Sequence, residues 1–76
     1  MPTFELHVIN SDFNACQDLD ARTVEEAMQR GLRAALQIGT DEICRGKPFF
    51  GAEVLVRDDG ATRARMMISL GQSPLK

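Results

Sequence analysis

The first part of the chain alternates between apolar and polar residues. Every second residue from Phe4 to Val8 is apolar, and this period of two is typical of a strand with one buried face. The run from Asn10 to Asn14 is rich in side chains that bond the local backbone in turns. We therefore predict a strand, a turn and a short second strand in which Cys16 and Asp18 share one face.

The middle of the chain has a helical period. Thr23 and Glu26 form a capping box, which marks the start of a helix. Apolar and small residues then recur at helical spacing on a stripe made up of Val24, Met28, Leu32, Ala35, Leu36, Gly39 and Ile43. Gly46 and Pro48 are typical of the end of a helix. Because glycine weakens a helix interior, Gly39 leaves two alternatives: one helix, which we favour and which a kink can accompany at this position, or two helices.

Alternation returns after the helix and predicts a closing hairpin. Apolar residues occupy the even positions from 52 to 56, and residues 62, 64, 66, 68 and 70 share a face of the last strand. A two-residue loop would place Arg63 opposite Val56 and push an arginine into the core. We therefore predict a three-residue loop, Asp58 to Gly60, with Gly60 in a left-handed conformation. This register sets Glu53 opposite Arg65.

The other face of the predicted sheet holds the candidate interaction residues. They are His7, Leu55, Arg57, Arg63, Arg65 and Met67. Three interpretations are open: a solvated, salt-bridged face, a dimer or partner surface marked by its apolar side chains, or a nucleic-acid surface. Glu5 and Glu53 would repel phosphates, and no aromatic residue is expected on this face for base stacking.

Size and composition restrict the class of protein. A chain of 76 residues with 43% hydrophobic residues forms one small domain, residues 1–76, whose core a partner subunit can help to complete. The net charge of -2 argues against a dedicated DNA-binding protein. The start of the chain has no signal-peptide pattern, and no segment approaches the roughly 20 apolar residues that span a membrane. We expect a cytoplasmic protein with a frayed tail at 71–76 and no membrane partner.

No set of residues indicates catalysis, and neither a cofactor nor a metal is expected. His7 is the only histidine, and no nucleophile is spaced to suggest a partner for it. Cys16 and Cys44 form no CxxC pair, so neither a redox motif nor a zinc framework is indicated. We expect both to be reduced thiols. The pair Asp58 and Asp59 lacks the further ligands of a calcium loop.

The chain shows two resemblances to known families. Most of the chain resembles a family of short bacterial proteins of unknown function, through His7-Val8, Glu26-Ala27, Arg45-Gly46, Val54 to Val56 and Asp58 to Gly60. That resemblance implies a fold and no activity.

The second resemblance is local and covers Asp12 to Leu36. This segment is similar to the N-terminal module of HicB-type antitoxins. The matching residues are Asp12, Phe13, Cys16, Thr23, Glu25, Glu26 and Ala27. The resemblance implies a module that dimerises and covers a small toxin, although no DNA-binding domain follows.

Together these patterns predict an α+β domain of order ββαββ, with an antiparallel sheet and one long helix on one face. The predicted core consists of Phe4, Leu6, Val8, Val24, Met28, Leu32, Ala35, Val54, Val56, Met66 and Ile68. We expect a non-catalytic interaction module that forms a homodimer, or binds an unlike protein, through the outer sheet face or an edge strand. The alternative is an antitoxin-like or nucleic-acid-associated regulator that uses the arginines.

Overall fold

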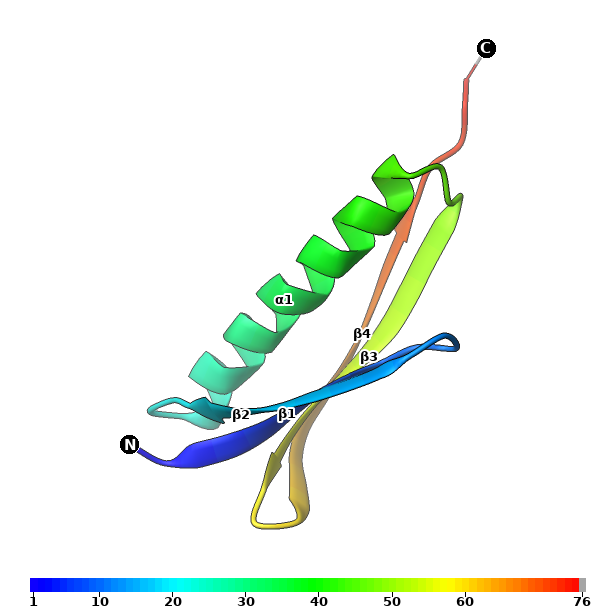
Figure 1. Cartoon of the computed structure of the whole chain (residues 1–76). Helices are drawn as coiled ribbons and strands as arrows, with labels where there is room; N and C mark the ends of the chain where they lie inside the picture. The colour runs from blue at the N-terminus through cyan, green and yellow to red at the C-terminus, as the bar shows by residue number, and fades with distance from the viewer. Residues whose placement is uncertain (76) are drawn as a thin grey trace.

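One helix follows two strands and precedes two more in the computed structural model, which describes residues 1–75 (Figure 1). The strands are β1 (Thr3–Ile9), β2 (Asn14–Asp20), β3 (Phe49–Asp58) and β4 (Ala61–Gly71), and the helix is α1 (Val24–Cys44). The strands form one antiparallel sheet in the order β2-β1-β3-β4. α1 lies against β1, β3 and β4 on one face. The predicted α+β fold is confirmed, and the strand order, which the sequence left open, places β2 and β4 at the edges.

The core lies between α1 and the sheet. Its buried apolar residues are Phe4, Leu6, Val8, Leu19, Ala21, Ala27, Met28, Ala35, Phe50, Ala52, Val54 and Val56. Of the predicted core, Val24, Leu32 and Ile68 pack against this cluster while partly exposed. Met66 was predicted wrongly, because its side chain is 45% exposed. It belongs to β4, which lies at the edge of the four-stranded sheet that the described residues form.

The helix is continuous through Gly39, so neither a break nor two helices are present. Gly39 is buried, and a Cβ atom at this position would lie only 2.7 Å from both Phe50 Cδ2 and Leu70 Cδ1. Ala27, Gly31 and Ala35 are buried on the same helical face. The small residues therefore let the helix backbone approach the sheet closely. Leu36, which was predicted on the buried stripe, is instead 41% exposed.

The helix begins as predicted at Thr23, whose Oγ1 accepts a hydrogen bond of 3.0 Å from the backbone N–H of Glu26. In a capping box the Glu26 carboxylate would accept from the N–H of Thr23. Here it accepts instead from the N–H of Arg22 at 3.4 Å. The cap thus satisfies one of the backbone donors that a helix start leaves unpaired.

We expect Thr23→Ala to lower the free energy of unfolding by about 1 kcal/mol, the usual value of such a cap. Thr23→Ser keeps the accepting hydroxyl and serves as the control. Urea unfolding measures both variants. Equal losses in the two variants would contradict a role for the hydroxyl.

The β3–β4 hairpin corrects the predicted loop. The turn has two residues, Asp59 and Gly60, with φ of 53° and 83°, and Asp58 pairs with Ala61. Two consecutive positive φ values are typical of the tight turn that matches strand twist. The register then shifts so that Val56 pairs with Ala64. The extra residue of this bulge is Arg63, which is how the chain keeps an arginine out of the core.

The prediction of a frayed tail from residue 71 is wrong for the first two residues of that tail. β4 continues to Gly71, and the backbone N–H of Gln72 donates to the Pro48 carbonyl at 3.0 Å. The Gln72 side-chain amide also donates to the carbonyls of Ile43 and Lys47, at 2.7 and 3.0 Å. The end of β4 is therefore tied to the end of α1, and residue 76 lies outside the described residues.

Ion pairs also stabilise the turn that follows α1. Gly46 takes the predicted left-handed conformation with φ of 106°. Lys47 Nζ lies 3.0 Å from the Glu42 carboxylate and 3.5 Å from that of Asp12. The hydrogen bond and charge of Glu42, followed by the charge of Asp12, raise the pKa of Lys47 above its ordinary value.

Candidate functional site

The sheet face opposite α1 is open, and the register defines which side chains share it. One row crosses all four strands through Cys16, His7, Leu55 and Arg65. A second row runs from Asp18 through Glu5 to Arg57, and a third contains Ile9, Glu53 and Met67. Five of the six predicted interaction residues therefore come together on this outer face. Arg63 does not, because it is the bulge residue and lines a groove between α1 and β4.

Each arginine of the predicted interaction face has an ion-pair or hydrogen-bond partner within the chain. Arg65 Nη2 lies 2.6 Å from the Glu53 carboxylate, so the two charges pair. The predicted register that sets them opposite each other is wrong, because Glu53 pairs with Met67 and Arg65 with Leu55. Arg63 pairs with Asp58 at 3.4 Å. Arg57 turns toward the hairpin and donates to the Gly60 carbonyl at 2.7 Å, while its buried Nε has no hydrogen-bond partner among residues 1–75. These contacts leave less positive charge free to meet a phosphate.

Apolar side chains on the outer face gather near the end of the sheet where β3 begins. Met67 is 71% exposed and Phe49 is 62% exposed. The Phe49 ring covers Gly51, where a Cβ atom would lie 3.0 Å from it. Together with Ile9 these residues line a shallow hollow. The expectation that this face carries no aromatic residue is therefore wrong. The odd position of Phe49 in β3 is the signal that places it on the outer face.

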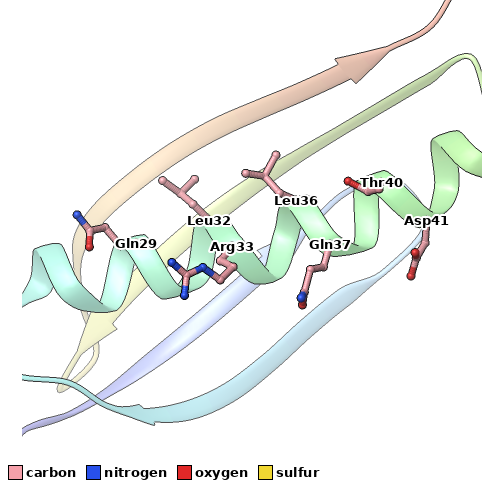
Figure 2. A pocket seen from close by; sticks show the side chains of 7 residues that line it. All are labelled: Gln29, Leu32, Arg33, Leu36, Gln37, Thr40 and Asp41. Carbon is pink, nitrogen blue, oxygen red and sulfur yellow. The ribbon is translucent and has the colours of Figure 1, made fainter.

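The β4 edge is the second exposed apolar feature. This strand has 11 residues and a neighbour on one side only. On the helix side, Val24, Met28, Leu32 and Met66 line the groove between α1 and β4. Leu32 and Leu36 point from α1 toward the side of β4, whereas Gln37 and Asp41 point away from it (Figure 2).

His7 has two close neighbours on the outer face. Its Nε2 atom lies 3.3 Å from Glu5 Oε1 and 3.6 Å from Cys16 Sγ. The three donor atoms all lie within 4.8 Å of one another. The sequence prediction placed Glu5 and His7 on one face but did not derive the β1–β2 register that sets Cys16 opposite His7. The hollows along α1, between α1 and β4, and near the start of β3 are lined by other residues.

The chain thus forms a two-layer α+β domain with a helix on one sheet face and an open face opposite. Comparison with models of known protein families, with curated proteins and with solved structures finds no match in any of the three. Within residues 1–75, no helix combines the length and the apolar character that crossing a membrane requires.

Proposed function

We propose that the protein is a non-catalytic interaction module that forms a homodimer by pairing β4 with β4 of a second copy. The observation that carries this proposal is the unprotected edge of β4. Natural edge strands are usually blunted by lysine or other charged side chains, proline, short length, a β-bulge or a covering loop. The bulge and both arginines of β4 lie in its first half. β4 has 11 residues without lysine or proline, and its second half from Met66 to Leu70 carries no charge.

Charge selects the register of such a pair. In a two-fold antiparallel pairing, each residue faces a counterpart at an equal distance beyond the axis. An axis near Arg63 or Arg65 would set arginines opposite each other, which is destabilising. An axis at Met67 sets Arg65 opposite Ser69 and Met66 opposite Ile68, so the uncharged half of the strand forms the centre.

The helix side of the domain fits the same arrangement. A two-fold axis perpendicular to the sheet places both helices on one face of an eight-stranded sheet. The two β3 strands then lie three strand spacings apart, or about 14 Å. Leu36 and Met66, which are 41% and 45% exposed, fill the space between the helices. Dimerisation therefore covers two residues whose exposure the sequence did not predict.

The remaining interpretations have less support. The arginines have intramolecular partners, which does not favour the nucleic-acid or antitoxin-like alternative. A candidate active site combines a pocket with convergent reactive groups, whereas the hollow along α1 is lined by neither histidine nor cysteine. We further propose a reducing cytoplasmic setting, in which the free thiols of Cys16 and Cys44 remain reduced.

Solution mass across a concentration series, at low and high salt, tests the dimer. We expect a dimer that persists at high salt, because its contacts are apolar. Met67→Lys sets two lysines face to face at the axis and is expected to shift the dimer dissociation constant upward at least tenfold, about 1.4 kcal/mol. Leu75→Lys adds the same charge at an apolar residue that is 96% exposed and lies outside β4. It should leave the mass unchanged.

A monomer at every concentration would overturn the proposal. So would a dimer that both lysine variants weaken equally. A series of species larger than the dimer would indicate head-to-tail pairing of β4 with β2 and would overturn the closed two-fold arrangement.

A further inference from the structure

The cluster of Glu5, His7 and Cys16 is independent of the dimer interface. These residues lie on β1 and β2, on the other side of β3 from the β4 edge. The His7 side chain is 17% exposed and that of Glu5 is 51% exposed, while Cys16 is an exposed free thiol. An imidazole held by its neighbours thus sits between two ligand groups that solvent can reach.

A single ring nitrogen contacts both neighbours. Nε2 of His7 lies 3.3 Å from the Glu5 carboxylate and 3.6 Å from the Cys16 sulfur. If Nε2 carries a hydrogen, that one hydrogen serves two acceptors. If it carries none, its lone pair faces the carboxylate oxygen, and two acceptors meet. A cation bound by all three atoms removes this conflict, because each of them then donates an electron pair.

We propose that Glu5, His7 and Cys16 bind one Zn²⁺ ion per chain, with the fourth position open to water. A thiolate, an imidazole and a carboxylate are the ligand types that zinc prefers. Calcium and magnesium take oxygen ligands and do not suit this set. Binding displaces the thiol proton of Cys16 to solvent, since the thiolate is the ligand.

The spacing of the donor atoms fits tetrahedral coordination. With Zn–S near 2.3 Å and Zn–N and Zn–O near 2.1 Å, tetrahedral angles put sulfur and nitrogen about 3.6 Å apart and nitrogen and oxygen about 3.4 Å apart. The corresponding distances here are 3.6 and 3.3 Å. Cys16 and Glu5 lie within 4.8 Å, so only small rotations of these exposed side chains complete the site.

The hairpin between β1 and β2 positions the ligands. The Asn10 side-chain oxygen accepts hydrogen bonds from the backbone N–H groups of Asp12 and Phe13, at 2.8 and 3.0 Å. The Asn10 N–H donates to the Phe13 carbonyl at 3.0 Å. This turn fixes the register in which Cys16 faces His7. Ligands on two adjacent paired strands are held more precisely than ligands on loops.

Titration with Co²⁺, which reports thiolate ligation and tetrahedral geometry in its absorption spectrum, tests the site on the reduced full chain. Zn²⁺ competition then gives the zinc affinity. We expect one ion per chain. Because even residues that only orient a metal ligand are worth about 10–100-fold in affinity, Cys16→Ser and His7→Gln should each lose about 100-fold or more. Cys44→Ser is the matched control, since Cys44 is also an exposed free thiol.

Four results of these titrations would contradict the proposed zinc site. Cobalt spectra without a thiolate band, or unchanged affinity in Cys16→Ser, would overturn the site. An equal loss in Cys44→Ser would show that the thiols bind metal without the cluster. One ion per two chains would replace the proposed site with a bridge between copies. Circular dichroism on each variant separates loss of ligation from loss of folding.

Discussion

Phe50→Ala is expected to remove most of the stability of this domain. Phe50 is 4% exposed and packs between β3 and α1, where its ring would meet any side chain at Gly39. Truncation of a buried phenylalanine costs about 3–5 kcal/mol, because transfer energy is lost and a cavity remains. The total stability of a small domain lies near the lower end of about 5–15 kcal/mol. Urea unfolding at one fixed protein concentration measures the loss.

The neighbouring residue provides the matched control. Phe49 is 62% exposed on the opposite sheet face, so Phe49→Ala should change the free energy of unfolding by less than about 0.5 kcal/mol. Similar losses for the two phenylalanines would contradict the assignment of faces in β3. The protein concentration must match between variants, since association contributes to the apparent stability.

Gly31→Leu is expected to destabilise the domain by about 3 kcal/mol, at the upper end of the usual cost of overpacking. A Cβ atom at this position would overlap Leu6 Cδ1 and lie 3.0 Å from Val54 Cγ1, and both of these residues are buried. The higher helix propensity of leucine, worth less than about 1 kcal/mol, does not offset that clash. Gln37→Leu adds the same side chain at an exposed position of α1 and should not destabilise the domain.

A double-mutant cycle identifies the clash itself. Gly31→Ala alone introduces the overlapping Cβ, and Leu6→Val shortens the side chain that it meets. If contact between them is the cause, the combined variant should lose less stability than the sum of the single losses, with a coupling of about 0.5–3 kcal/mol. Additive losses would instead place the strain elsewhere in the helix.

The order of elements and most core positions were predictable because each depends on local periodicity. The alternation around Leu6 and Val54 and the cap at Thr23 need no knowledge of distant contacts. Gly39 shows the limit of this reasoning. Its low helix propensity suggested that the helix could break here, yet the helix continues through Gly39, which packs closely against Phe50.

The candidate site was predictable only in part, because it depends on strand pairing. Successive side chains of a strand point to opposite faces of the sheet, so His7, Leu55 and Met67 could be placed on the outer face. The bulge at Arg63 removes this residue from the predicted interaction face. The alternation of apolar and polar residues does not by itself reveal a bulge. The contact of Cys16 with His7 required the register of a hairpin whose second strand has a single buried residue, Leu19.

The strand order also determines how the domain meets mechanical force. β1 and β4 both pair antiparallel with β3, so they run parallel to each other on its two sides. The start of β1 and the end of β4 lie at opposite ends of the molecule (Figure 1). A pull on the two termini therefore drags β1 and β4 past β3 in opposite directions. Both hydrogen-bond ladders resist at once in shear, and neither can be unzipped one bond at a time from its end.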